Sequence, residues 1–266
     1  MTKRAMAIGC HPDDIEFMMA GTLLKLQKAG YEIHYMTVAS GSLGTNQYDF
    51  ETIKRIRRDE AKAAAESIGA IYHESVCDDI EVFYNLESIG GVLKAIREVA
   101  PEIILTHGPY DYMEDHVCAG RLAVTAAFCR GMANFRGVST PITEQDVVVY
   151  HSMPHSITDQ LRRPVIPGIF VNISEMVETK KKMLSCHRSQ KEWLDHSQGI
   201  DAYLQELEKR SYYYGKMSNR YTAAEGWIRH NNLGFAPLGF NPLLEALGED
   251  AFINEEFEKN CSEAIL

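Results

Sequence analysis

The sequence predicts an α/β fold built on a mostly parallel sheet. Short apolar segments alternate along the chain with helical segments of ten or more residues, which is the pattern of βαβ units. The chain has 266 residues, of which 45% are hydrophobic and 24% are charged, as is usual for a globular protein. Because no repeat, low-complexity tract or evident linker divides it, we expect a single domain over residues 1–266, with 235–266 as a candidate helical extension.

The first half of the chain predicts strands and helices in strict alternation. An apolar strand at residues 6–9 is followed by a helical pattern from Ile15, and the next strand covers residues 32–39. A loop at 40–44 with two glycines precedes a helix at 52–68, which Gly69 ends. A short strand at 71–74, a helix at 86–99, a buried strand at 102–106 and a helix at 117–129 complete this half.

The second half predicts strands at residues 147–150 and 168–173 and helices at 174–186 and 201–214. The charged, periodic segment 243–263 predicts a terminal helix, which would pack either on the domain or on a partner subunit. The sequence leaves both arrangements open. It also leaves open whether the protein forms a homo-oligomer.

Composition narrows the class of protein. The net charge of −10 disfavours a nucleic-acid-binding protein, which would usually be basic. No apolar run approaches the roughly 18 residues of a membrane-spanning helix, and the first strand begins too early for a signal peptide. The six cysteines are scattered without a Cys-x-x-Cys pair, which indicates reduced thiols. We therefore expect a cytoplasmic protein that binds neither nucleic acid nor membrane.

The segment from His11 to Glu16 holds one imidazole and three carboxylates within six residues. It lies where the first predicted strand ends and the first helix begins. In an open α/β sheet, ligands bind in the crevice at the carboxyl ends of the strands. The alternative reading is structural, because an Asp-Asp pair before a helix also caps it and pairs with its dipole.

The spacing of His11 and Asp14, with Pro12 stiffening the turn between them, lets both side chains approach one ion. A catalytic metal site needs a third ligand, and His116 is the best candidate because it also follows a strand and opens a helix. Two imidazoles and one carboxylate suit Zn²⁺, and Fe²⁺, Mn²⁺ or Co²⁺ fit the same ligands. Taken alone, His116 would more simply be a structural or surface histidine.

Such a site suits the hydrolysis of an amide. A bound cation would lower the pKa of a water molecule toward ~7. Asp13, next to the ligand Asp14 but free to face the water, would act as general base and then protonate the leaving amine.

These motifs together resemble the PIG-L / LmbE-like family of metal-dependent N-acetyl-sugar deacetylases. The resemblance runs from residue 5 to residue 230 and rests on several segments of the sequence. They are Gly9-Cys10-His11-Pro12-Asp13-Asp14-Ile15-Glu16 with Gly21-Thr22-Leu23, Thr37-Val38-Ala39-Ser40-Gly41-Ser42-Leu43-Gly44, Arg57-Arg58-Asp59-Glu60, Asp115-His116, Cys186-His187-Arg188-Ser189-Gln190 and Ala224-Glu225. The first and the Cys-His-x-Ser-Gln segments are specific, whereas the glycine loop and the Ala-Glu pair are weak alone.

The resemblance implies a Rossmann-like three-layer fold with one divalent, zinc-type metal ion at the strand C-terminal edge. It places the metal ligands at His11, Asp14 and His116 and the catalytic base at Asp13. It also implies a small-molecule substrate, an N-acyl amino sugar or its glycoside, from which the acetyl or other acyl group is removed.

The resemblance also assigns residues around this centre. Arg57 would contact the sugar, although the basic run around it is also typical of a solvated helical face. Asp115, Met113, His187 and Gln190 would lie close behind the site, and for His187 and Gln190 helix capping is an equal alternative.

One position departs from the family pattern. Where family members usually have His-Pro-Asp-His, this chain has Met113-Glu114-Asp115-His116, so an imidazole that stabilises the oxyanion in the family is a methionine here. Losing such a donor typically costs about 10²–10³ in rate. Five residues are candidates for replacing it, and the sequence does not rank them: His107, His151, His155, Tyr110 and Tyr112.

Two alternative functions follow from these observations. The methionine is compatible with a weakened or inactive homologue that binds metal and sugar without turnover. A nucleotide-binding oxidoreductase would share the fold class, but Gly9 is followed by Cys10-His11-Pro12 and not by the Gly-x-Gly-x-x-Gly that cradles pyrophosphate.

Overall fold

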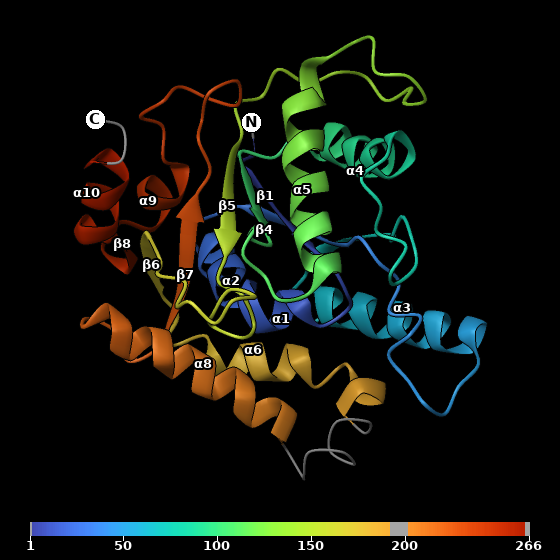
Figure 1. Cartoon of the computed structure of the whole chain (residues 1–266), viewed down its shortest axis with the longest axis horizontal. Coiled ribbons are helices and arrows are strands. Elements are labelled where there is room, and N and C mark those ends of the chain that lie inside the picture. The colour runs from blue at the N-terminus through green and yellow to red at the C-terminus, as the bar shows by residue number, and fades with distance from the viewer. Residues whose placement is uncertain (1, 192–201, 264–266) are drawn as a thin grey trace.

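The computed structural model describes residues 2–191 and 202–263, and it has helices on both faces of one eight-stranded sheet (Figure 1). The strand order is β3-β2-β1-β4-β5-β7-β6-β8. The strands are β1 (Arg4–Gly9), β2 (Glu32–Thr37), β3 (Ile71–His73), β4 (Ile103–Thr106), β5 (Val148–Ser152), β6 (Ile169–Asn172), β7 (Ala224–Arg229) and β8 (Ala251–Ile253). The predicted α/β fold with a mostly parallel sheet is confirmed.

The parallel part of the sheet places two strand ends side by side. Strands β1 to β5 all pair in parallel, whereas β7 is antiparallel to β5 and β6, and β8 is antiparallel to β6. The order β3-β2-β1-β4-β5 is Rossmann-like, and the strand order reverses between β1 and β4, although these two strands are parallel. In this pair Ile8 lies opposite Thr106, so the loops that follow both strands open into the same crevice.

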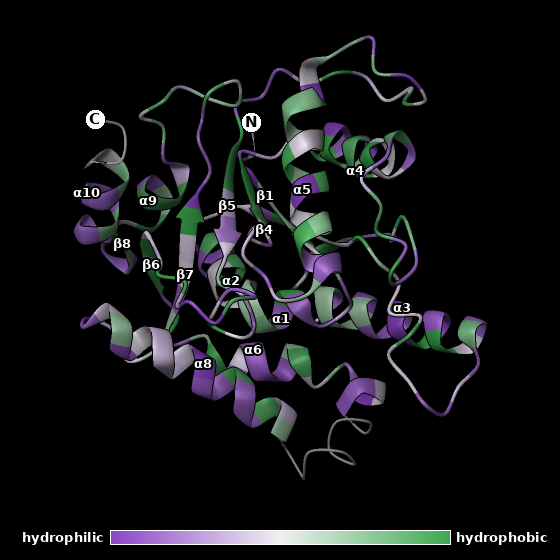
Figure 2. Ribbon diagram, in the orientation of Figure 1, coloured by the Kyte–Doolittle hydropathy of each residue, from purple (hydrophilic) through white to green (hydrophobic). Residues whose placement is uncertain are grey.

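The helices form an outer layer on each face of the sheet. They are α1 (Asp14–Met18), α2 (Ala20–Lys28), α3 (Phe50–Glu66), α4 (Leu86–Val99), α5 (Glu114–Phe128), α6 (Val177–Leu184), α8 (Ala202–Ser218), α9 (Pro242–Leu247) and α10 (Glu255–Glu263), with 3₁₀ turns η1 (Cys129–Gly131) and η2 (Gly248–Asp250). Helices α4 and α5 enclose one apolar core, and α1, α2, α6 and α9 enclose the other. Figure 2 shows the resulting pattern, with apolar stretches on the strands and alternating polar and apolar bands on α3 and α8.

A buried acid in β7 fixes the start of α2. Glu225 accepts hydrogen bonds from the backbone N–H groups of Gly21 (2.9 Å) and Thr22 (2.7 Å) and from the Lys180 ammonium (2.7 Å). A β-carbon at Gly21 would lie 2.6 Å from Ile173, so only glycine fits this close approach. The Gly-Thr-Leu and Ala-Glu segments therefore form one structural unit, although Gly21 and Glu225 are 204 positions apart in the chain.

Several elements differ from the sequence prediction. The expected first helix is two helices, α1 and α2, which meet at Met19. Strand β7 was not expected, because its buried Glu225 breaks the apolar pattern that marks a core strand. The expected single helix over 243–263 is wrong: it is α9, η2, β8 and α10, and β8 extends the sheet. Asp201, the expected start of α8, lies outside the described residues.

No helix within residues 2–191 and 202–263 is both long and apolar enough to cross a membrane.

Candidate metal and catalytic site

The segments predicted to carry chemistry meet at the crevice between the ends of β1 and β4. His11, Asp13 and Asp14 follow β1, and His116 lies in the first turn of α5, which follows β4. All four line one cavity of about 1010 Å³. The wall of this cavity is completed by residues from the loops at 41–44 and 79–84 and from the start of α8.

A single oxygen of Asp14 is the meeting point of three imidazoles. Asp14 Oδ2 accepts the backbone N–H of His11 (2.7 Å) and lies 3.5 Å from His11 Nδ1. The Nε2 atoms of His116 and His107 are each 3.3 Å from the same oxygen. Burial opposes ionisation of Asp14, but the charge of His116 outweighs it and helps to hold the pKa of the carboxyl well below its usual value.

Two of these imidazoles have a second carboxylate next to the ring nitrogen that points away from Asp14. The outer nitrogen of His11, Nε2, is hydrogen-bonded to Asp115 (3.2 Å), and the outer nitrogen of His116, Nδ1, lies 3.1 Å from Asp111. A carboxylate on the far nitrogen fixes the ring and is the usual environment of a metal-binding histidine. The inner nitrogens of both rings then face Asp14. Burial lowers the pKa of His116, but the carboxylates of Asp14 and Asp111 outweigh burial and raise it to about 9.

Among the described residues, two groups of three side chains have ligand atoms within 4.8 Å of one another. One is Cys10, His11 and Asp14, and the other is Asp14, His107 and His116. The surroundings of Cys10 and His107 disfavour both as ligands. His107 Nε2 accepts the backbone N–H of Cys10 (2.8 Å), which occupies its lone pair, and burial raises the pKa of the Cys10 thiol to about 12. The donors with free inner nitrogens are His11 and His116, and both lie next to Asp14.

Asp13 is held in a strained position beside this group. Its backbone is left-handed, with φ 100°, a conformation in which aspartate and asparagine are among the few tolerated residues. Its Oδ2 accepts the Tyr203 hydroxyl (2.6 Å) and the Arg57 guanidinium (3.3 Å). No described residue bonds to Oδ1, so this oxygen is available to a water molecule in the cavity. Such stored strain is typical of functional positions.

Arg57 is not on a solvated face, so that alternative is wrong. The residue is 2% exposed, and one of its nitrogens also donates a short hydrogen bond to the Pro12 carbonyl. Gly41, with φ 78°, passes so close that a β-carbon there would lie 2.8 Å from the guanidinium. The predicted glycine loop therefore covers Arg57, which clamps the Pro12-Asp13 turn. Its Nε and Nη1 have no hydrogen-bond partner among the described residues.

The residues expected behind the site divide into two groups. Met113, at the start of α5, and Gln190 line the cavity, as Asp115 does. His187 lies elsewhere: its Nε2 is 3.3 Å from the fully buried Glu16, which also accepts the Tyr35 hydroxyl (3.0 Å). His187 thus lies against Glu16 of α1.

Sequence reasoning missed two residues of the site. Asp111 stands in the segment that contains His116, but nothing in its spacing marks it as the partner of that histidine. Tyr203 lies 190 positions from Asp13, on a helix that carries no motif. Only the folded chain brings these side chains to the site.

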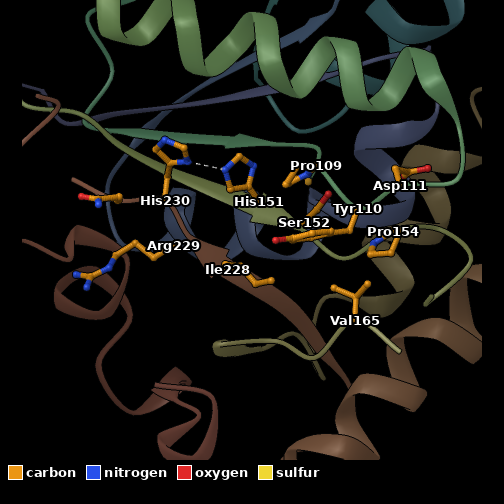
Figure 3. Close-up of a pocket in the computed structure, with 12 residues that line it drawn as sticks. Pro109, Tyr110, Asp111, His151, Ser152, Pro154, Val165, Ile228, Arg229 and His230 are labelled. Carbon is orange, nitrogen blue, oxygen red and sulfur yellow. Dashed lines mark hydrogen bonds between the residues drawn. The ribbon is translucent and has the colours of Figure 1, made fainter. Parts of the chain in front are cut away.

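The structure separates the five residues that were expected to be candidates for replacing a histidine at position 113. His155 and Tyr112 line the large cavity, whereas His107 is fully buried. His151 and Tyr110 line a second cavity of about 190 Å³, where His151 is hydrogen-bonded to His230 (2.9 Å) (Figure 3). Of the five, His155 and Tyr112 are therefore the ones that face the large cavity.

His155 is the better placed of these two to hydrogen-bond a substrate. Its ring packs edge-on against Phe17, with centroids 5.0 Å apart, and its carbonyl accepts a hydrogen bond from Arg210. Burial and the charge of Arg210 lower the pKa of His155 to about 4, so the ring is neutral at pH 7. None of the described residues hydrogen-bonds to its ring nitrogens. Tyr112, by contrast, is 49% exposed.

Comparison with known proteins identifies the family. The PIG-L model, described as GlcNAc-PI de-N-acetylase, matches residues 6–127. A diacetylchitobiose deacetylase from Thermococcus kodakarensis is 31% identical over 84% of this chain and 82% of its own length. A probable N-acetyl-alpha-D-glucosaminyl L-malate deacetylase from Bacillus cereus is 28% identical, over 72% of this chain and 86% of its own.

A solved structure shares the fold without close sequence similarity. It is a 4-carboxy-2-hydroxymuconate hydratase from Pseudomonas putida, with a TM-score of 0.73 and 21% identity over 90% of this chain and 99% of that one. The motifs, the strand order and the alignment with the Thermococcus enzyme over most of both chains agree: this chain belongs to the PIG-L family.

Proposed function

We propose that this protein is a metal-dependent hydrolase that removes the acetyl, or another acyl, group from an N-acylated amino sugar or its glycoside. The main support for the proposal is that two imidazoles, those of His11 and His116, lie against Asp14, which follows the strained Asp13. Each of the two rings also has a carboxylate at its outer nitrogen. The relatives named as deacetylases of N-acetyl sugars support an enzyme over a protein that binds sugar without turnover.

His11, Asp14 and His116 are the proposed ligands of one divalent cation, with Zn²⁺ as the first choice and Fe²⁺, Mn²⁺ or Co²⁺ compatible with the same donors. The donor set fits such an ion, because each imidazole has its outer nitrogen beside a carboxylate and its inner nitrogen toward Asp14. When bound, the cation would polarise the acyl carbonyl and lower the pKa of a water molecule toward ~7.

Asp13 is the proposed general base. Tyr203 and Arg57 both bond to its Oδ2, which leaves Oδ1 to take a proton from the attacking water. As the C–N bond breaks, the same carboxyl returns the proton to the departing nitrogen, so that the products are a carboxylic acid and a free amine. Arg57 remains the proposed sugar contact, through the nitrogens that have no partner among the described residues.

Replacing Asp115 with asparagine is expected to weaken metal affinity or activity by about 10–100-fold, the usual cost of losing the carboxylate behind a metal-binding histidine. Metal titration of the apoprotein measures the effect. Glu114→Gln is the matched control, since it removes a neighbouring carboxylate that lines the same cavity without contacting either histidine. Equal metal affinity in wild type and the Asp115 variant would contradict the role given to Asp115.

His155 is proposed to donate a hydrogen bond to the oxyanion in place of the missing imidazole at position 113. The His155→Ala variant should lose about 10²–10³ in kcat with a smaller change in KM. Introducing Met113→His into that variant should restore part of the loss. An unchanged kcat in His155→Ala would assign the role to Tyr112 or to the metal alone.

The proposed function is tested by incubating the metal-loaded protein with N-acetylglucosamine, diacetylchitobiose and N-acetylglucosaminides, and measuring free amine together with acetate. Elemental analysis of the same preparation gives the metal. We expect about one divalent ion per chain and equal amounts of amine and acetate. If no free amine is released from any of the N-acyl amino sugars, the proposal is contradicted.

A further inference from the structure

The outer wall of the large cavity is apolar, unlike its floor. The floor consists of the proposed metal ligands and Asp13, all polar. The wall includes five large apolar or aromatic side chains that the protein leaves exposed: Leu43 (50%), Ile80 (69%), Phe83 (60%), Tyr84 (44%) and Tyr112 (49%). Exposed apolar groups gathered in one place usually mark a binding surface.

The segment that carries most of this wall is tied to the floor. The Ile80 N–H donates to Asp115 Oδ2 (2.8 Å), the same oxygen that bonds to His11. Four residues further on, the Tyr84 hydroxyl is hydrogen-bonded to Thr125 of α5 (3.1 Å). The wall therefore stands at a fixed place relative to the reacting centre.

The charge of the cavity disfavours substrates that carry a phosphate or several carboxylates. Among the described residues that line it, six carry carboxylates and one, Arg57, is an arginine or lysine. The six acids are Asp13, Asp14, Asp79, Glu114, Asp115 and Glu206. Arg57 is buried and already bonded to Asp13. A phosphate or dicarboxylate on the substrate would therefore meet six acids and, among the arginines and lysines of these described residues, only the buried Arg57.

The size of the cavity also exceeds what one sugar needs. Its volume of about 1010 Å³ stands at the upper end of the range for pockets that enclose drug-sized molecules. A single N-acetyl sugar on the floor would leave the apolar wall uncovered.

We propose that the substrate is an uncharged N-acyl amino sugar that carries an extended apolar group, which packs against the wall formed by Leu43, Ile80, Phe83, Tyr84 and Tyr112. This inference rests on the proposed function and specifies its substrate class. The apolar group is either the aglycone or the acyl chain, because both flank the amino sugar. Burying an alkyl chain strengthens binding severalfold per methylene group.

The test compares kcat/KM for release of free amine from four compounds: N-acetylglucosamine, its octyl glycoside, N-octanoylglucosamine and N-acetylglucosamine 1-phosphate. We expect at least a tenfold advantage over N-acetylglucosamine for one of the two octyl compounds, and the compound that gains shows which group meets the wall. The phosphate should be the poorest substrate. No advantage for either octyl compound, or a preference for the phosphate, overturns the inference.

Two wall variants give a second measurement. Phe83→Ser removes an aromatic ring, and Ile80→Asn removes an apolar side chain at a backbone φ of 65°, which asparagine tolerates. Each variant should reduce the ratio of kcat/KM for the preferred octyl compound to kcat/KM for N-acetylglucosamine toward one. Leu238→Ser is the matched control, because Leu238 is 67% exposed and lies outside the lining of this cavity. A ratio that the wall variants leave unchanged also contradicts the inference.

Binding of octyl glucoside, which has no amide, separates the two proposals. Below its micelle concentration it should raise the melting temperature of the wild type more than glucose does, and Phe83→Ser should lose the difference. Suppose that the protein releases amine from N-acetylglucosamine, but the octyl group raises neither kcat/KM nor the melting temperature. The proposed function then stands, and the binding of an apolar substrate group to the wall is refuted. Octyl glucoside binding without amine release from any compound supports the wall and refutes the deacetylase.

Discussion

Replacing Asp13 with asparagine is expected to lower kcat by about 10²–10⁴-fold, the contribution of a general base, while the metal stays bound. Asparagine suits the left-handed backbone at this position and can still accept the Tyr203 and Arg57 hydrogen bonds through its amide oxygen. What it cannot do is take a proton from water. Alanine would also test the base, but it is strained at φ 100° and loses both bonds.

For this variant, both the rate of amine release and the metal content must be measured. Amine release is measured beside elemental analysis, so that loss of the base is distinguished from loss of the ion. Glu206→Gln is the control, since it removes another carboxylate of the same cavity. Activity near the wild-type level in Asp13→Asn would remove Asp13 from the mechanism.

Replacing Asp14 with asparagine is expected to abolish turnover for a different reason, because the ion itself is lost. Asp14 Oδ2 is the atom on which the inner nitrogens of His11 and His116 converge, and it supplies the one negative charge of the proposed ligand set. The variant should therefore contain little or no divalent metal, whereas Asp13→Asn should contain as much as the wild type.

The same measurement separates the proposed ligands from their neighbour His107. His11→Gln should lose metal, and His107→Gln, if it folds, should keep more of it, because the Nε2 of His107 already accepts the Cys10 N–H. Circular dichroism of both variants shows whether each is folded. Metal retained in a folded His11→Gln and lost in a folded His107→Gln would assign the site to Asp14, His107 and His116 instead.

The centre of the site could be predicted from sequence because its residues lie next to strand ends. His11 follows β1 and His116 follows β4 by a short loop, and parallel pairing of β1 with β4 brings both to one edge. A local pattern and one rule about parallel sheets were enough to place them together.

The residues that support this centre could not be predicted in the same way. Tyr203 reaches Asp13 from α8, and no local pattern encodes a contact between a helix and a turn so distant in the chain. For Arg57 the sequence left two interpretations open, a sugar contact implied by the resemblance and a solvated helical face, because burial of its guanidinium depends on the glycine loop and the Pro12 carbonyl folding over it.

The limits of the fold prediction have a similar cause. Strand β7 contains an acid that is buried only because Lys180 and the start of α2 satisfy it, so its sequence lacks the apolar run of a central strand. Strand β8 has three residues, too few to show a period of two within a charged tail that otherwise favours helix.

The central claim is that His11, Asp14 and His116 hold a metal ion on which hydrolysis of an N-acyl amino sugar depends. The most direct measurement is amine release by protein stripped with a chelator and then reloaded with one equivalent of Zn²⁺. The account predicts no release from the stripped protein and recovery of release on reloading, with neither recovery nor metal binding in Asp14→Asn. Release that persists in fully stripped protein, or that Zn²⁺ restores in Asp14→Asn, would contradict it.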